Sequence, residues 1–437
     1  MSKLALTGGK PVRTEPFPPY NTIGEEEKGA VLEVLESGNL SQFIGAWHED
    51  FLGGPRVRTF EEKWCDFFGS SHAISVNSAT SGLYAAVGAC GAGPGDEVIV
   101  SPYTMTASAI APMIYGAVPV FADIDPDIFC ITPDAVKGLI TERTRAIIVV
   151  HIFGQPADMD GIMELARAHD IRVIEDCAQC PTARYRGKYA GTIGDMGVFS
   201  LNYHKHIHTG EGGMIVTDNP ELATRARLIR NHGEAAVEGM GRPDLAEITG
   251  FNYRMPEIEA AIGVCQLEKL PGLIEKRLKN AEFIARGLDG IEGITPPVVK
   301  SDREHVYYSM PFKYRQENFN GVGRDSFVKA VQAELPVTLL RETTPLMSAG
   351  YVKPLYMQPL YQANMTPCAS NCPRYKGKVS YEQGICPVAE RMHFHELFTM
   401  EYMRPSMREK EMNDVINAFH KVCENMEELK EWEMKQI

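Results

Sequence analysis

With 437 residues, of which 44% are hydrophobic and 23% charged, the chain has the composition of an ordinary globular protein of two or three domains. A formal net charge of −13 at pH 7, with no basic run, argues against a nucleic-acid partner, because clustered lysine and arginine hold phosphate backbones. The first residues lack an apolar segment of the kind that directs secretion, so we expect a cytoplasmic protein.

Short apolar runs alternate with helical patterns between about residues 60 and 233. The runs that predict strands are HAISVN (72–77), DEVIVSP (96–102), VPVFADID (118–125), RAIIVVHIFG (145–154), IRVIEDC (171–177), GVFSLN (197–202) and GMIVTD (213–218). Strands of nearly continuous valine and isoleucine, separated by helices, indicate a largely parallel sheet that is covered on both faces. The sequence therefore predicts a large α/β domain.

The uncharged stretch 98–122 is long enough to cross a membrane as a helix. Its three prolines and many small polar residues favour a strand, a loop, a helix and a second strand in a soluble core, so we expect no membrane span. The ten cysteines are expected to be reduced thiols. Cys177 and Cys180 have CxxC spacing, but no second pair completes a zinc set, and we expect no metal.

The sequence pattern changes near residue 265. Longer charged helices begin there, followed by a second region in which helical and strand patterns both occur. We therefore divide the chain into an N-terminal arm (1–20), a large α/β domain (21–265) and a smaller C-terminal α/β domain (266–437). The segment 343–386 is rich in proline, tyrosine, methionine and cysteine. A loop of this length is more often functional or interfacial than idle.

Candidate site residues come directly after the predicted strands, because ligands of open α/β sheets bind beyond the carboxyl ends of the strands. The sequence NSATSG places Thr80 and Ser81 at a helix start, which suits a phosphate, although the same residues also cap helices without a ligand. Asp176 ends a buried run and needs a cationic partner or hydrogen-bond donors. The protonated ring nitrogen of pyridoxal phosphate would be such a partner.

The stretch SLNYHKHIHTGEGG contains Lys205 among three histidines and allows three interpretations. A metal site would need ligands beyond His204, His206 and His208, and we find none. A phosphate loop would need a lysine after the glycines, which is absent. The third interpretation is a reactive amine: near histidines and a cofactor ring, Lys205 can shift toward its neutral form and condense with an aldehyde.

The combination of EDCAQ, a serine five residues before the lysine, GEGG and FNYR resembles the DegT/DnrJ/EryC1/StrS family of sugar aminotransferases. The similarity extends from SGNLSQ (37–42) to CPVAE (386–390). The resemblance implies a fold-type I transferase dependent on pyridoxal phosphate, like aspartate aminotransferase. Such a protein has a large, mostly parallel sheet domain and a smaller C-terminal α/β domain.

The resemblance also implies a role for each matching residue. Lys205 would be the Schiff-base lysine that shuttles protons, Asp176 would pair with the pyridinium nitrogen, and Gln179 would lie near the 3-oxygen of the ring. The residues implied to hold the phosphate are Ala79, Thr80, Ser200 and, from the neighbouring subunit, Asn252. A site completed by a second chain implies a homodimer.

Two positions depart from the family pattern. Ala79 occupies the place of a usual glycine, a change that an ordinary backbone angle tolerates. Met105 occupies the place of an aromatic residue that usually stacks on the cofactor ring, so either Met105 packs its sulfur there or Tyr103 takes the role. Polar residues that could contact the substrate, each with an alternative structural role, are His204, His232, Arg254, His305 and Tyr307.

The implied reaction has two halves. L-Glutamate or L-glutamine leaves its amino group on the cofactor, giving pyridoxamine phosphate, and a carbonyl of a sugar, nucleotide-linked sugar or cyclitol then receives it. Such reactions make amino sugars for polysaccharides or antibiotics. Two alternatives are a dehydratase of the same family, in which histidine replaces the lysine, and a non-catalytic dimer that binds the cofactor. The presence of Lys205 together with Asp176, Gln179 and Ser200 favours the aminotransferase.

Overall fold

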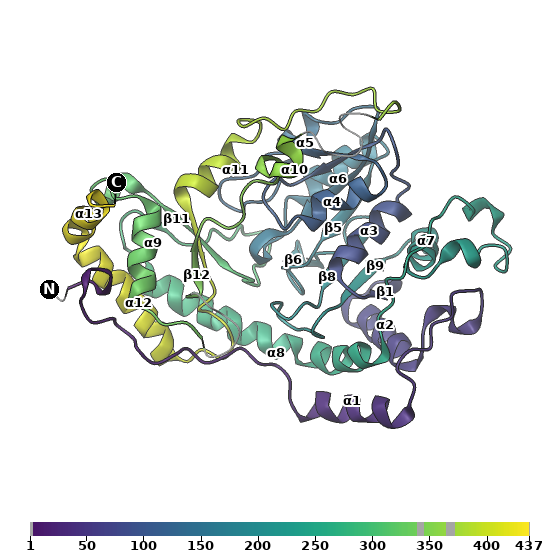
Figure 1. Ribbon diagram of the computed structural model, residues 1–437, viewed down its shortest axis with the longest axis horizontal. Helices are drawn as coiled ribbons and strands as arrows, with labels where there is room; N and C mark the ends of the chain where they lie inside the picture. Colours follow the sequence, from purple (N-terminus) through teal and green to yellow (C-terminus); the bar gives the residue numbers. More distant parts are fainter. Residues whose placement is uncertain (1–2, 339–344, 364–371, 437) are drawn as a thin grey trace.

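The computed structural model describes residues 3–338, 345–363 and 372–436, and its larger sheet has the order β1-β9-β8-β5-β4-β2-β3 (Figure 1). The strands of this sheet are β1 (His72–Val76), β2 (Glu97–Val100), β3 (Val118–Phe121), β4 (Thr144–Val150), β5 (Arg172–Asp176), β8 (Met196–Ser200) and β9 (Gly213–Thr217). Strand β9 runs opposite to all the other strands of this sheet, which are parallel to one another. The predicted, largely parallel sheet is therefore confirmed.

Helices cover both faces of this sheet, which explains why its strands are apolar at successive positions. Ile215 packs in the core formed with α3 (Ala79–Ala89) and α7 (Pro220–Arg230). Its neighbours Met214 and Val216 pack on the other side, in the core formed with α2 (Pro55–Phe68) and α8 (Glu257–Leu288). The remaining elements of this part include α4 (Ala107–Ile114), α5 (Pro133–Lys137), α6 (Met159–Ala168) and the hairpin of β6 (Arg184–Tyr185) and β7 (Lys188–Tyr189).

The stretch 98–122 forms most of β2, then α4 and β3, as predicted. Among the residues that the structure describes, no helix combines the length and apolar character that a membrane crossing needs.

A second, antiparallel sheet has the order β10-β11-β13-β12. Its strands are β10 (Ile294–Thr295), β11 (Met310–Tyr314), β12 (Met347–Ala349) and β13 (Leu397–Met400). Its core also takes residues from the end of α8 and from three further helices, α9 (Arg324–Ala333), α12 (Glu409–Glu424) and α13 (Met426–Met434). The predicted boundary between residues 265 and 266 falls inside α8, which packs on α1 (Glu25–Ser37), α2 and α12.

Described residues between β12 and β13 contact the larger sheet at β2 and β3, and α10 (Pro359–Gln362) from this part of the chain lies near α5 (Figure 1). The hydroxyl of Tyr381 donates to the carbonyl oxygen of Pro119 at 3.0 Å, and that of Tyr375 donates to the Glu97 carboxylate at 2.9 Å. This part of the chain also carries α11 (Pro387–Arg391). Residues 343–344 and 364–371 of the predicted functional loop lie outside the described residues. The described part shields an edge strand that would otherwise be open to pairing.

Candidate functional site

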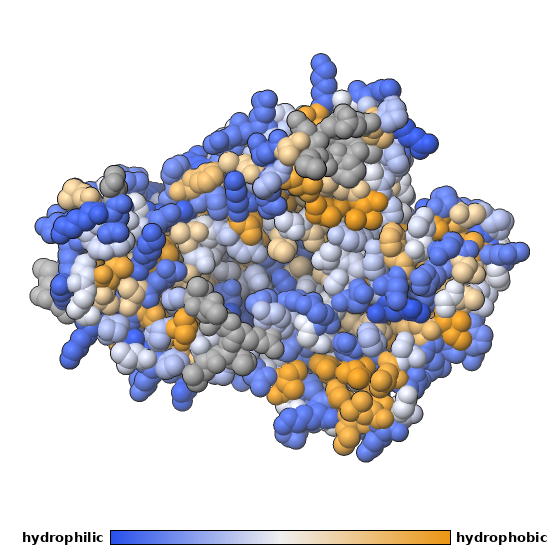
Figure 2. Space-filling model, in the orientation of Figure 1, coloured by the Kyte–Doolittle hydropathy of each residue, from blue (hydrophilic) through white to orange (hydrophobic). Residues whose placement is uncertain are grey.

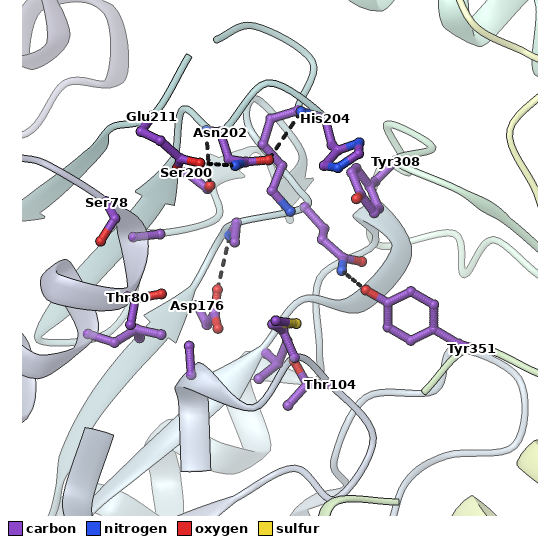
Figure 3. Close-up of a pocket in the computed structure, with 18 residues that line it drawn as sticks. Ser78, Thr80, Thr104, Asp176, Ser200, Asn202, His204, Glu211, Tyr308 and Tyr351 are labelled. Atoms are coloured by element: carbon purple, nitrogen blue, oxygen red, sulfur yellow. Dashed lines mark hydrogen bonds between the residues drawn. The ribbon is translucent and has the colours of Figure 1, made fainter. Parts of the chain in front are cut away.

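A cavity of about 390 Å³ lies where β4, β5 and β8 end, bounded by Val150, Asp176 and Ser200 (Figure 3). The start of α3 closes it on one side, through Ser78, Ala79 and Thr80. Its volume is in the range of small-molecule sites. The cavity therefore lies at the carboxyl ends of the strands, where the sequence places the candidate residues.

Lys205 lines this cavity from the turn that follows β8. Its backbone N–H donates to the carbonyl oxygen of Asn202 at 2.9 Å, and its Nζ lies 4.4 Å from the ring centre of Tyr308. Loss of water around the amine lowers the pKa of Lys205 to about 8, against the opposing effect of the Asp176 and Glu401 carboxylates. At pH 7 about a tenth of the amine is therefore neutral and nucleophilic, far more than for an ordinary lysine.

Asp176, the last residue of β5, is almost fully buried, and both of its carboxylate oxygens accept hydrogen bonds. The hydroxyl of Ser108 donates to Oδ2 at 2.8 Å, and the backbone N–H of Ala178 donates to Oδ1 at 3.1 Å. Burial raises the pKa of Asp176, while these two bonds and the nearby Lys205 act in the opposite direction. A protonated ring nitrogen would give this carboxylate the charged partner that its burial demands.

The first turn of α3 offers an anion site at the cavity wall. The first N–H groups of a helix have no partner within it, and the helix dipole favours negative charge there. The Ser78 hydroxyl caps this helix by accepting from the Ser81 N–H at 3.1 Å. A Cβ at Gly213 would lie 2.7 Å from the Ala79 nitrogen, so the absence of a side chain lets β9 approach the helix start.

The arrangement fits the shape of pyridoxal phosphate. Ser78, Thr80 and Ser200 lie on one side of Asp176, and Tyr308 and Tyr351 lie on the other (Figure 3). One cavity thus contains a group for each part of the cofactor. Anion-binding groups suit the phosphate, a carboxylate suits the ring nitrogen, and an amine suits the aldehyde.

Gln179, also on the cavity wall, is held at both ends of its side-chain amide. Its Oε1 accepts from the Phe153 N–H at 2.7 Å, and its Nε2 donates to the Tyr351 hydroxyl at 2.8 Å. The second bond links the loop after β5 to Tyr351, which Figure 3 shows beside the cavity.

Of the two residues proposed to lie against the cofactor ring, Met105 lines the cavity and has 60% of its surface exposed. Tyr103 does not line it: this side chain is fully buried, and its hydroxyl accepts from the Tyr351 N–H at 2.9 Å. Packing of Tyr103 against the rings of Tyr351 and His393 explains the difference. The geometry favours Met105, and Tyr103 supports the wall behind it.

Of the predicted substrate residues, His204 lines the cavity, whereas the single chain does not bring His232, Arg254, His305 or Tyr307 to it. His305 is buried, its Nδ1 accepts from the Tyr307 N–H at 2.9 Å, and burial lowers its pKa to about 3. With so low a pKa, the His305 imidazole is uncharged near neutral pH. It serves here to shape the backbone before β11.

Arg254 donates from Nε to the Oδ1 of Asn252 at 2.8 Å. Asn252 is exposed and lies outside the cavity of its own chain, which is compatible with the predicted contact to a neighbouring subunit.

Sequence reasoning missed several residues around Lys205. Tyr308 and Tyr351 line the cavity, but they lie more than 100 residues further along the chain and carry no local motif. Asn202 and Glu211 belong to the SLNYHKHIHTGEGG stretch and bond to each other at 2.8 Å. Their proximity to Lys205 in sequence could have indicated them.

A smaller cavity of about 170 Å³ shares His204 with the first. Ser348, Thr399, Glu401 and Arg404 supply its polar groups. The Arg404 guanidinium and the Glu401 carboxylate form an ion pair of 2.6 Å there. Hydroxyl, carboxylate and guanidinium groups thus extend the polar wall beyond the lysine.

The histidines beside Lys205 do not form a metal site among the described residues. His206 is buried, its Nε2 lies 3.0 Å from the Val306 carbonyl oxygen, and burial moves its pKa well below the ordinary value. A different group does have ligand atoms within 4.8 Å of one another, namely His151, Cys177 and Cys180.

Both ring nitrogens of the buried His151 already have hydrogen-bond partners, which argues against His151 as a metal ligand. Nδ1 of His151 accepts from the Ala157 N–H at 3.1 Å, and Nε2 lies 2.9 Å from the Glu175 carboxylate. The histidine therefore serves a buried hydrogen-bond network.

Known proteins similar to this chain in sequence and in structure are aminotransferases. The model of the DegT/DnrJ/EryC1/StrS aminotransferase family matches residues 21–420. The L-glutamine:2-deoxy-scyllo-inosose aminotransferase of Micromonospora echinospora is 34% identical over 98% of this chain and all (100%) of that protein. The solved aminotransferase of Psychrobacter cryohalolentis is 29% identical, with a TM-score of 0.80 over 94% of this chain and 100% of that one. DesI, solved with its TDP-sugar product, is 25% identical, with a TM-score of 0.81 over 99% of each chain.

Proposed function

The chain belongs to the DegT/DnrJ/EryC1/StrS aminotransferase family, and we propose that Lys205 is the residue through which this fold-type I, pyridoxal-phosphate-dependent enzyme binds its cofactor. One observation carries the proposal: the amine of Lys205, the buried carboxylate of Asp176 and the start of α3 face a single cavity. Each of these groups suits a different part of the cofactor.

When bound, pyridoxal phosphate supplies an electron sink for the negative charge that develops at the α-carbon of the amino donor. In the proposed mechanism the Asp176 carboxylate holds the proton on the ring nitrogen. The start of α3 and Ser200 bind the phosphate. Lys205 Nζ, neutral in part because of its pKa of about 8, would accept the proton from the donor α-carbon and deliver it to carbon C4′ of the cofactor. The Tyr308 ring, 4.4 Å from Nζ, attracts the protonated form of this amine.

The proposed donor is L-glutamine or L-glutamate, and the proposed acceptor is a ring carbonyl flanked by hydroxyl groups, on a cyclitol or a sugar. The similar Micromonospora enzyme is named for L-glutamine and a cyclitol ketone, which supports this choice. The product of DesI is a TDP-sugar, so a nucleotide-linked acceptor is the second candidate. The walls of the two cavities offer hydrogen-bonding groups that suit a polyhydroxylated ring, from Asn202, Glu211, Ser348 and Thr399.

The first test uses the absorbance of the purified enzyme with its cofactor. Addition of L-glutamine or L-glutamate alone should convert the spectrum of the lysine-bound cofactor into that of the aminated cofactor. A cyclitol ketone or a TDP-linked keto sugar, added next, should restore the first spectrum, and the better of the two identifies the acceptor class. If neither donor changes the spectrum, the dehydratase alternative takes precedence. A cofactor that responds to no substrate at all would indicate a non-catalytic dimer.

We further propose that the enzyme is a cytoplasmic homodimer in which Asn252 reaches the phosphate site of the partner. Apolar side chains gather on the surface over α1 (Figure 2), where Leu32 and Leu35 have 54% and 52% of their surfaces exposed. Ile44 and Trp47 are exposed as well, at 42% and 46%. Large exposed apolar patches are typical of protein interfaces.

The loop that carries the exposed residues Ile44 and Trp47 is also connected to Asn252. Asn231 donates from Nδ2 to the Ile44 carbonyl oxygen at 2.9 Å and pairs with Asn252 through a backbone bridge. An interface over this loop would therefore involve the residue proposed to complete the neighbouring site. Light scattering of the purified enzyme measures the assembly, and a monomer at working concentration would contradict the shared site.

A further inference from the structure

Ser108 lies on the first turn of α4, behind the cavity wall, and its side chain has no exposed surface. Its hydroxyl donates to Oδ2 of Asp176 at 2.8 Å. Ser108 does not itself line the cavity, whereas Ala107 beside it does. Ser108 can therefore influence the cavity only by way of its hydrogen bond to the Asp176 carboxylate.

The state of charge of Asp176 decides whether the site can hold a protonated ring nitrogen. Burial favours the neutral acid, and few groups oppose it: the hydroxyl of Ser108, the N–H of Ala178, the amine of Lys205 and the ring of His151. The other titratable groups near enough to interact with the charge of Asp176 are Cys177, Cys180 and Tyr351, and Asp176 raises the pKa of each. Ser108 supplies the shorter of the two hydrogen bonds to the carboxylate, and hydrogen bonds to a charged acceptor are the stronger kind.

We propose that Ser108 is a positioning residue that keeps Asp176 ionised and turned toward the cavity, so that its free lone pairs bind the protonated ring nitrogen of the cofactor. The proposal rests on the proposed function, because it assumes that Asp176 faces that nitrogen. Ser108 touches neither cofactor nor substrate. Its effect passes entirely through the carboxylate.

The alternative is a purely structural role, in which the bond only fastens α4 to the end of β5. A matched control separates the two roles. Ser75 on β1 is also fully buried, and its hydroxyl donates to the Glu61 carboxylate at 2.9 Å, but it does not line the cavity. The change Ser75→Ala therefore removes a similar buried bond without touching Asp176.

The experiment compares two ligands on the apoenzyme: pyridoxal phosphate and its analogue with carbon in place of the ring nitrogen. Dissociation constants are measured across the neutral pH range for the wild type, Ser108→Ala, Ser108→Thr and Ser75→Ala. Circular dichroism checks that each variant is folded. The analogue lacks the proton that Asp176 would hold, so it reports on every contact except this one.

We expect Ser108→Ala to bind pyridoxal phosphate about tenfold more weakly than the wild type at neutral pH, the effect of losing one hydrogen bond to a charged group. The loss should shrink as the pH rises, because Asp176 then ionises without the help of the hydroxyl. Binding of the analogue should change less than about twofold. Ser108→Thr, which keeps a hydroxyl, should restore the wild-type affinity, and Ser75→Ala should alter neither ligand.

Three results would overturn the proposal. An equal loss for both ligands in Ser108→Ala would show a structural role. Unchanged binding of both ligands would show that Asp176 does not depend on the hydroxyl. If the wild type itself bound the two ligands equally well, the assignment of Asp176 would fail, and the proposed function with it. A failure of the proposed function is thus distinguishable from a failure that concerns Ser108 alone.

Discussion

The contact between Lys205 and Tyr308 leads to a quantitative prediction. The amine lies 4.4 Å from the ring centre, within the distance at which an aromatic face attracts a cation. Such contacts stabilise the ammonium form by about 0.5 to 2 kcal/mol, and 1.36 kcal/mol corresponds to about one pKa unit. The change Tyr308→Leu, which keeps the site apolar but removes the ring, should therefore lower the pKa of Lys205 from about 8 to between ~6.5 and ~7.6.

The assay is the rate at which the apoenzyme attaches pyridoxal phosphate, measured by stopped-flow absorbance over a range of pH. Only the neutral amine attacks the aldehyde, so the rate should rise with a midpoint at the pKa of Lys205. At pH 7 the neutral fraction, and hence the rate, should increase about two- to eightfold in Tyr308→Leu. Tyr308→Phe keeps the aromatic face and should retain the wild-type midpoint. A midpoint in Tyr308→Leu at or above the wild-type value would refute the reasoning, because exclusion of water by the ring would then outweigh its attraction for the cation.

Three further predictions concern the lysine, the partner contact and the core. Lys205→Ala should abolish amino transfer while leaving the circular dichroism spectrum intact, and substantial glutamine-dependent activity would refute the assignment. Asn252→Ala should weaken cofactor binding about tenfold if one hydrogen bond to the phosphate is lost, whereas an unchanged affinity would contradict the shared site. Arg230→Met should lower the free energy of unfolding by about 3 to 5 kcal/mol, measured with denaturant, because it leaves Glu61 without the cation 2.6 Å away.

The sequence alone was enough to predict the place of those site residues that directly follow or end a strand. Asp176 and Ser200 are the last residues of β5 and β8, and Thr80 lies in the helix that follows β1. Parallel strands bring such positions to one edge of the sheet, so a correct prediction of the strands also brings these side chains together. Lys205 follows β8 closely enough to share that edge.

The opposite wall of the cavity could not be predicted in this way. Tyr308 and Tyr351 reach it because the second sheet packs beside the first, and no local pattern encodes that packing. The choice between Met105 and Tyr103 depends on which side of one turn faces the cavity, which periodicity does not specify. The same limit applies to His305, since a polar residue in a sequence gives no sign of being buried against Tyr307.

The opposite pKa shifts of Lys205 and Asp176 have a common origin. Burial disfavours both charged forms, which lowers the pKa of the amine and raises that of the acid, while their mutual attraction limits both shifts. A cavity that held only one of these groups would stabilise its neutral form more strongly. With both groups present, the amine stays close to the point where it can either attack a carbonyl or carry a proton, and the acid can still ionise with help from Ser108. The two residues are therefore best understood as a pair whose reactivity depends on their burial in the same cavity.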